Sequence, residues 1–162
     1  MLHKAIVASR KGGIHGVCLT TTEPIGAGEL VWELDEPMYS WGEIQSWDKE
    51  RREAFDWYGF RCGEDLYSLP EGLSREMNYC CNPNTWWDGS TRLVARRDIE
   101  AGEEITYDYT TCEVSDEFEM ECHCGSELCR GTITSRDYLD LEWQARYGEN
   151  LPPHVLAAIR RG

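Results

Sequence analysis

Three cysteines in the last third of the chain have the spacing of metal ligands. Cys122, Cys124 and Cys129 form a C-x-C-x4-C pattern, and Gly125 and Gly131 can supply the tight turns that a metal-binding knuckle needs. Zinc prefers thiolates in closed tetrahedral sites, so the pattern predicts three of the four ligands of one zinc ion. A closed site of four thiolates has no open position for catalysis, so we expect this metal to be structural.

The fourth ligand must come from another part of the chain. His123 is a poor candidate, because both of its neighbours would already bind the ion, which leaves Cys80, Cys81 and Cys112. The eight cysteines could instead form disulfides in a secreted protein. We favour metal binding, because the first residues do not resemble a signal peptide and the chain can bury a core without disulfides. The expected location is an intracellular, reducing compartment, either the cytoplasm or the nucleus.

The composition predicts a folded and strongly acidic protein. The chain has 162 residues, of which 41 % are hydrophobic, and it includes seven Trp and eight Tyr. A net charge of −14 repels nucleic acid and attracts a basic partner such as a lysine-rich peptide, although acidity also serves solubility. No apolar stretch approaches the roughly 20 residues of a membrane-spanning helix. We therefore expect neither direct nucleic-acid binding nor a membrane anchor.

The first half of the sequence is typical of strands and turns. Residues 4–9, 17–21 and 30–34 are short apolar runs that predict strands. Residues 25–31 (IGAGELV) and 99–105 (IEAGEEI) resemble each other, with an Ala-Gly turn between an apolar residue and a β-rich run. Both segments are predicted to form hairpins, because glycine readily adopts the positive φ that such turns require.

Three helices are predicted from periodicity and capping residues. Residues 46–58 have apolar residues near helical spacing, which indicates an amphipathic helix. A second helix is predicted to begin at Ser135, to end at Gly148 and to place Leu139, Trp143 and Tyr147 on one face. A third is predicted from Pro153 to Arg161, because proline fits the first turn of a helix.

Three blocks of the sequence resemble motifs of the SET-domain protein-lysine methyltransferases. Residues 14–19 and 24–29 (IHGVCL and PIGAGE) are similar to the family's opening glycine-rich region. Residues 75–84 (REMNYCCNPN) resemble its R-F-x-N-H-S-C-x-P-N signature, and residues 102–109 (GEEITYDY) resemble G-E-E-L-T-x-D-Y. Residues 122–131 (CHCGSELCRG) are similar to the family's post-SET motif C-x-C-G-x3-C-R-G.

This resemblance implies a mainly β fold with short helices, in the α+β class. Its parts would be small curved β-sheets, a knot-like crossing of the N-Y-C-C and D-Y segments, a four-cysteine zinc knuckle near the C-terminus and tail helices. The implied boundaries are a SET domain at 1–111 with a variable insert at 40–70 and a catalytic core at 72–111, a post-SET segment at 112–134, and a helical tail at 135–162.

The resemblance also implies an activity and the residues that carry it. The chain would transfer a methyl group from S-adenosylmethionine to a lysine of a basic substrate, such as a histone or another basic protein tail. Tyr109 would be the active-site tyrosine. Tyr107 occupies the Phe/Tyr switch position, where a hydroxyl narrows the lysine channel and implies mono- or dimethylation. The implied cofactor-binding residues are His15, Gly16, Val17, Arg75, Asn78 and Tyr79. The implied zinc ligands are Cys81, Cys122, Cys124 and Cys129.

Some positions depart from the family pattern. Ile14 stands where the first glycine of the opening motif is expected, Tyr79 replaces a histidine, and Cys80 replaces a serine. Ile14 and Tyr79 favour one alternative, a catalytically silent SET module that binds a peptide or partner. A second alternative is a zinc-stabilised interaction domain unrelated to SET proteins. Such a domain would have no reason to carry the Asn78 and Tyr109 blocks.

Overall fold

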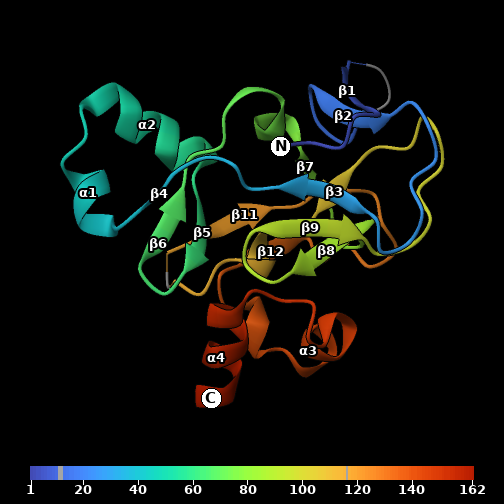
Figure 1. Ribbon diagram of the computed structural model, residues 1–162. Coiled ribbons are helices and arrows are strands. Elements are labelled where there is room, and N and C mark those ends of the chain that lie inside the picture. The colour runs from blue at the N-terminus through green and yellow to red at the C-terminus, as the bar shows by residue number, and fades with distance from the viewer. Residues whose placement is uncertain (11–12, 116) are drawn as a thin grey trace.

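A small antiparallel sheet lies at the centre of the molecule. The computed structural model describes residues 1–10, 13–115 and 117–162 (Figure 1). In this sheet, β9 (Arg92–Ala95) pairs with both β3 (Leu30–Glu33) and β8 (Thr85–Asp88). Leu93 and Trp87 lie opposite each other on β9 and β8, and both are buried in the main core.

A second three-stranded sheet supports two helices on one side of the molecule. Its strands are β4 (Met38–Tyr39), β6 (Leu66–Ser68) and β5 (Phe60–Gly63), in that order. Between β4 and β5 the chain forms α1 (Trp41–Gln45) and α2 (Lys49–Tyr58), which extend away from the central sheet (Figure 1). This region coincides with the segment that was predicted to be the variable insert.

The segment predicted to be the variable insert contains two short helices, where the sequence predicted one. Ser40 and Glu43 form a capping box at the start of α1, and Ser46 ends that helix. Asp48 then starts α2 by accepting a hydrogen bond from the backbone N–H of Arg51. The predicted helix over 46–58 is therefore confirmed as α2, with a later start at Lys49, whereas α1 was not predicted.

Of two further strand pairs, the second brings distant parts of the chain together. β1 (Ile6–Ser9) and β2 (Cys18–Thr21) are antiparallel. β7 (Asn78–Tyr79) and β10 (Thr106–Tyr107) are parallel, with Asn78 beside Thr106 and Tyr79 beside Tyr107. The backbone N–H of Cys80 continues this pairing with a hydrogen bond to the carbonyl of Tyr107. The two signature segments therefore lie side by side.

The two similar segments around residues 25 and 99 do not form hairpins. Ile25 and Ile99 pair with each other through two backbone hydrogen bonds of 2.9 Å. Each segment then turns at a glycine with positive φ, 82° at Gly28 and 85° at Gly102. The turn was correctly predicted, but the partner strands were not: the strand after Gly28 pairs with β9, and Glu104, after Gly102, pairs with Thr20.

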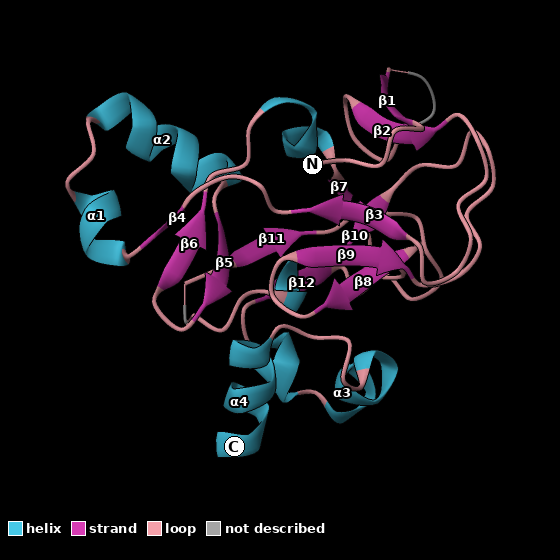
Figure 2. Ribbon diagram, in the orientation of Figure 1, coloured by secondary structure: helices cyan, strands magenta, loops and turns pink. Residues whose placement is uncertain are grey.

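The C-terminal third forms a short β-ribbon followed by two helices. β11 (Glu119–Glu121) pairs antiparallel with β12 (Thr132–Thr134). The tail contains α3 (Leu141–Tyr147) and α4 (Pro153–Arg161), which lie below the sheets in Figure 2. The prediction for α4 is confirmed at both ends, with proline in its first turn. Short 3₁₀ turns occur at Gly72–Glu76, Tyr109–Thr111 and Asp137–Leu139.

The start of α3 differs from the prediction. Ser135 is buried and does not cap the helix, which begins after Asp140, whose carboxylate accepts a hydrogen bond from the N–H of Trp143. Trp143 is buried as expected, whereas Leu139 lies in the preceding 3₁₀ turn and is 44 % exposed. The error arose because aspartate and serine are similarly good caps and both precede the apolar residues.

Buried side chains of the described residues gather in three clusters. The largest underlies the central sheet, a second surrounds the cysteine knuckle, and a third holds the tail helices together. Within the described part of the chain, no helix is both long and apolar enough to cross a membrane.

Candidate functional site

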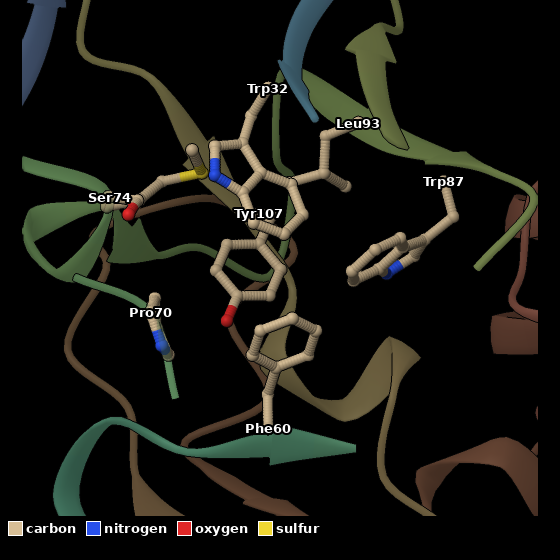
Figure 3. Close-up of a pocket in the computed structure, with 8 residues that line it drawn as sticks. Trp32, Phe60, Pro70, Ser74, Trp87, Leu93 and Tyr107 are labelled. Carbon is tan, nitrogen blue, oxygen red and sulfur yellow. The ribbon is translucent and has the colours of Figure 1, made fainter. Parts of the chain in front are cut away.

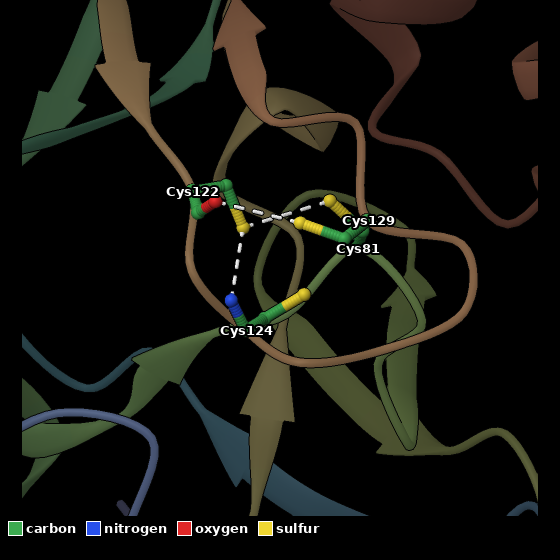
Figure 4. A group of neighbouring side chains, drawn as sticks. All are labelled: Cys81, Cys122, Cys124 and Cys129. Atoms are coloured by element: carbon green, nitrogen blue, oxygen red, sulfur yellow. Dashed lines mark hydrogen bonds between the residues drawn. The ribbon is translucent and has the colours of Figure 1, made fainter.

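Four cysteine thiols converge at one point near the C-terminal ribbon. The Sγ atoms of Cys81, Cys122, Cys124 and Cys129 all lie within 4.8 Å of one another (Figure 4). Those of Cys81 and Cys122 are 3.7 Å apart. Zinc–sulfur bonds of about 2.3 Å in a tetrahedron place the sulfurs about 3.8 Å apart, so this geometry fits a zinc ion. The structure thus brings together all four predicted ligands, and all eight cysteines are free thiols.

Backbone N–H groups donate hydrogen bonds to sulfur atoms of this cluster, which stabilises negative charge on them. The N–H of Arg130 donates to Sγ of Cys81 at 3.2 Å, and the N–H of Cys124 donates to Sγ of Cys122 at 3.4 Å. Burial raises the pKa of the Cys124 thiol, but hydrogen bonds from the backbone of Cys81 and Ser126 outweigh it and lower that pKa to about 7. These hydrogen bonds therefore favour the thiolate form of Cys124, the form in which cysteine binds a metal.

A buried polar network joins the knuckle to the rest of the fold. The Tyr79 hydroxyl lies 2.9 Å from Sγ of Cys81 and accepts a 2.6 Å hydrogen bond from the guanidinium of Arg130. The same guanidinium donates to both carboxylate oxygens of Asp108, at 2.9 and 2.8 Å. The Tyr147 hydroxyl of α3 also donates to Asp108, at 2.7 Å. The network therefore connects a signature segment, the knuckle and the tail.

A cavity of about 330 Å³ lies against one side of the knuckle. Its walls come from the opening glycine-rich segment, the two signature segments and the knuckle, including two of the clustered cysteines. The residues around it are Ile14, His15, Asn78, Tyr79, Tyr109, Met120, Glu121, Cys122, His123 and Cys124. Four residues predicted to bind the cofactor or to act in catalysis therefore border one cavity: His15, Asn78, Tyr79 and Tyr109.

Asn78 connects the signature strand to the opening segment. Its side-chain nitrogen Nδ2 donates to the carbonyls of His15 at 2.9 Å and Val17 at 3.2 Å. Between these two residues, Gly16 has a φ of 53°, which lets the chain turn around the amide. The structure thus places His15, Gly16 and Val17 beside Asn78, although only His15 of the three borders the cavity.

The two predicted catalytic tyrosines form a pair. The rings of Tyr107 and Tyr109 have centroids 4.7 Å apart, and the Tyr109 hydroxyl donates a 2.8 Å hydrogen bond to the carbonyl of Met77. Burial, followed by the negative charges of Cys112 and Glu104, raises the pKa of the Tyr109 hydroxyl. It therefore remains a neutral hydrogen-bond donor at physiological pH.

Tyr107 borders a second, narrower cavity of about 30 Å³. Half of its lining residues are aromatic, and Figure 3 shows the Tyr107 hydroxyl pointing towards Phe60 and Pro70. The full set of lining residues is Trp32, Phe60, Pro70, Ser74, Met77, Trp87, Leu93 and Tyr107. Because Tyr109 borders the large cavity and Tyr107 the narrow one, the tyrosine pair lies between the two.

Arg75 lies away from the large cavity. Its guanidinium donates to the carbonyl of Pro70 at 2.6 Å and lies 5.0 Å from the ring centroid of Tyr58. Pro70 borders the narrow cavity, so this placement gives no support to the predicted contact between Arg75 and the cofactor. The position of Arg75 in the signature motif predicted a contact with the cofactor. In the structure, its guanidinium instead contacts a backbone carbonyl and an aromatic ring.

One acidic residue at the site was missed by sequence reasoning. The carboxylate of Glu104 accepts hydrogen bonds from Nδ2 of Asn78 and from the backbone N–H of Ile14, both at 2.8 Å. Glu104 is the second glutamate of the Gly-Glu-Glu sequence, which was interpreted only as context for Tyr109. Because successive side chains of an extended strand point to opposite faces, Glu104 could have been placed on the face opposite Ile105, which is buried in the core.

Comparison with known proteins assigns the chain to a family. The family model described as "SET domain" matches residues 16–110, more than half of the chain. The chain is a member of the SET-domain family. The matched SET domain contains Asn78, Tyr107 and Tyr109, and it ends before the knuckle.

Several curated relatives carry similar SET domains. A "Histone-lysine N-methyltransferase, H3 lysine-4 specific" of Debaryomyces hansenii is 34 % identical over 148 residues, which cover 80 % of this chain and 13 % of the relative. "Histone-lysine N-methyltransferase ASHR3" of Arabidopsis thaliana is 33 % identical over 118 residues, covering 64 % of this chain and 23 % of the relative. The chain thus spans less than a quarter of the length of these two relatives.

A solved structure has the same fold. A chain in "Crystal structure of an active polycomb repressive complex 2 in the basal state" matches with a TM-score of 0.52 and 26 % identity. The match covers 65 % of this chain and 15 % of that chain. The expected class of fold, a mainly β SET domain with a four-cysteine cluster near its C-terminus, is therefore confirmed.

Proposed function

We propose that this SET domain is a protein-lysine N-methyltransferase that uses S-adenosylmethionine and acts on a histone or another basic protein tail. The observation that carries the proposal is the position of the Tyr107–Tyr109 pair between the large cavity and the narrow one, each of which one of the two tyrosines borders. Methyl transfer to lysine needs two such sites, because donor and acceptor must meet in line from opposite directions.

The large cavity suits the cofactor in size and chemistry. Its volume of about 330 Å³ lies within the range of small-molecule sites, and His15 and Asn78 bring polar groups to its border. His15, Asn78 and Tyr79 would hold the cofactor there. S-adenosylmethionine would supply an electrophilic methyl group on a sulfonium. Ile14 borders the cavity as well, and its side chain is compatible with the turn that Gly16 completes.

The lining of the narrow cavity, rather than its volume of about 30 Å³, suits the end of a lysine side chain. Its walls of Trp32, Phe60, Trp87 and Tyr107 can contact a lysine's methylene groups and its cation. A free lysine has a pKa of about 10.4, and an apolar surrounding lowers it, which favours loss of the proton before transfer. The neutral Tyr109 hydroxyl, fixed by the Met77 carbonyl, would orient the amine. With the cofactor bound, the deprotonated amine would be placed to take up the methyl group, and the sulfonium would leave as a neutral thioether.

The metal cluster and the net charge support two further parts of the proposal. Cys81, Cys122, Cys124 and Cys129 would hold one structural zinc ion, which would fix the knuckle wall of the cofactor cavity. A net charge of −14 favours association with a basic substrate such as a histone tail, which would place the activity in the nucleus. Tyr107 would limit the product to mono- or dimethyllysine.

Calorimetric titration of the zinc-loaded protein with S-adenosylmethionine tests the cofactor site. Asn78→Ala removes the amide that borders the cavity, and we expect it to abolish micromolar binding. Tyr109→Phe keeps the ring and removes only the hydroxyl, and we expect it to retain binding. A folded wild-type protein that binds no cofactor at millimolar concentration would instead be a catalytically silent SET module.

A further inference from the structure

We infer that Glu104 is a positioning residue that orients Asn78 and the opening segment for the cofactor, an inference that rests on the proposed function. Its two carboxylate oxygens have different partners. Oε1 accepts from Nδ2 of Asn78 at 2.8 Å, and Oε2 accepts from the backbone N–H of Ile14 at 2.8 Å. Asn78 and Ile14 both border the large cavity.

The first contact decides which end of the Asn78 amide faces a ligand. Nδ2 has three acceptors, the carbonyls of His15 and Val17 and the carboxylate of Glu104. Because a carboxylate is the strongest acceptor of the three, it keeps the nitrogen turned away from the cavity. The amide oxygen Oδ1 is then the end available to a ligand. An oxygen acceptor suits the α-ammonium of an amino acid, whereas an exposed –NH₂ group would repel it.

The second contact holds the opening segment in place. Ile14 lies where the family pattern has a glycine, and its N–H is fixed by Oε2 of Glu104 at 2.8 Å. The neighbouring Gly13 already packs closely on Cys18, since an added Cβ would come within 2.7 Å of its Cβ. The segment is thus held by close packing at Gly13 and by the carboxylate at Ile14. One side chain therefore couples two walls of the cavity.

A glutamine at position 104 cannot reproduce both contacts. Its single side-chain oxygen can accept from Asn78 or from Ile14, and its –NH₂ group then meets the other donor. A hydrogen bond to a charged group is lost and a donor is left unpaired, so we expect the Kd of a bound cofactor to rise by about ten- to a hundredfold.

The test is calorimetric titration of the zinc-loaded Glu104→Gln protein with two ligands, S-adenosylmethionine and S-adenosylhomocysteine. Both ligands carry the same α-ammonium, but only the first carries a sulfonium charge. A positioning residue acts through Asn78, so Glu104→Gln should weaken both ligands by the same factor. Weakening of S-adenosylmethionine alone would overturn the inference, because Glu104 would then act directly on the sulfonium.

Glu103→Gln is the matched control. Glu103 precedes Glu104 and also accepts side-chain hydrogen bonds, but from Arg97 at 3.1 Å and Asn84 at 3.1 Å, neither of which borders the cavity. We expect Glu103→Gln to lower the melting temperature without changing either Kd. Equal affinities in wild type and Glu104→Gln would overturn the inference alone. A wild-type protein that binds neither ligand would overturn the proposed function, and this inference with it.

A second measurement covers the case in which Glu104→Gln does not fold. Glu104→Asp keeps the charge but is one methylene shorter, so it can reach only one of the two donors, and we expect an intermediate increase in both Kd values. In the wild-type protein, the side-chain amide protons of Asn78 should exchange slowly with solvent. Rapid exchange of these protons would overturn the inference.

Discussion

The hydroxyl oxygen of Tyr79 lies 2.9 Å from Sγ of Cys81, so a residue that borders the large cavity touches a member of the cysteine cluster. Cys122 and Cys124 belong to the cluster and border the same cavity. The candidate metal site and the candidate cofactor site therefore share a wall. We expect a change in the structure of one site to alter binding at the other.

Removal of zinc is expected to abolish cofactor binding. Without the metal, four close thiols lose their common partner and the knuckle wall of the cavity loosens. Cys81→Ser should have the same effect as a chelator, and elemental analysis should find less than one zinc ion per chain. Cys62→Ser is the control, because Cys62 lies in the main core and outside the four-cysteine group. Full cofactor affinity in chelated protein would contradict this coupling.

Breaking the buried ion pair between Arg130 and Asp108 should strongly destabilise the protein. Asp108 is 1 % exposed and the Arg130 side chain 19 % exposed, so Arg130→Met leaves a buried carboxylate without its cation. We expect the free energy of unfolding in urea to fall by about 3–5 kcal/mol. In the control Arg92→Met, which removes the exposed pair with Asp88, the loss should be about 0–1 kcal/mol. Equal losses would show that burial does not matter here.

The stability of the protein should depend on the ionisation of Glu113. Burial raises the pKa of its carboxyl from 4.5 to about 7, against an opposing effect of Arg61. The folded state therefore favours the protonated form, and this contribution is lost as the pH rises towards and through 7. Glu113→Gln should be more stable than wild type by about 1–3 kcal/mol at pH 8.5, and by less at pH 6. Thermal unfolding across this range measures the difference, with the exposed Glu117→Gln as control.

Tyr107→Phe should raise the number of methyl groups added to one lysine. The Tyr107 side chain borders the narrow cavity, and loss of its hydroxyl makes room for a larger methylated amine. Mass spectrometry of the product peptide should show a shift towards higher methylation, whereas Tyr109→Phe should lower the rate without that shift. The same product distribution in wild type and Tyr107→Phe would rule out a limiting function for this hydroxyl.

The local signals in the sequence predicted much of the fold. Pro153 gave the start of α4, and the cysteine spacing gave three members of the cluster. The partner strands of Ile25 and Ile99 could not be predicted, because a turn motif does not state which strand lies beside it. The missed helix α1 did carry a signal, since Ser40 and Glu43 have capping-box spacing.

The candidate site was predictable only in part. The family resemblance gave Asn78 and Tyr109, which the structure brings to one cavity, but it also gave Arg75, which lies elsewhere. Glu104 was missed because its partners, Ile14 and Asn78, are far from it in the sequence. Contacts of this kind depend on tertiary packing, which no local pattern records.

Mass spectrometry of a histone H3 tail peptide, incubated with the zinc-loaded protein and S-adenosylmethionine, tests the proposed activity most directly. The account predicts that the mass of the peptide increases by one or two methyl groups on a lysine, and that Asn78→Ala abolishes this increase. A protein that binds the cofactor but methylates no lysine in H3 or in a panel of basic peptides would contradict the account and favour the silent module.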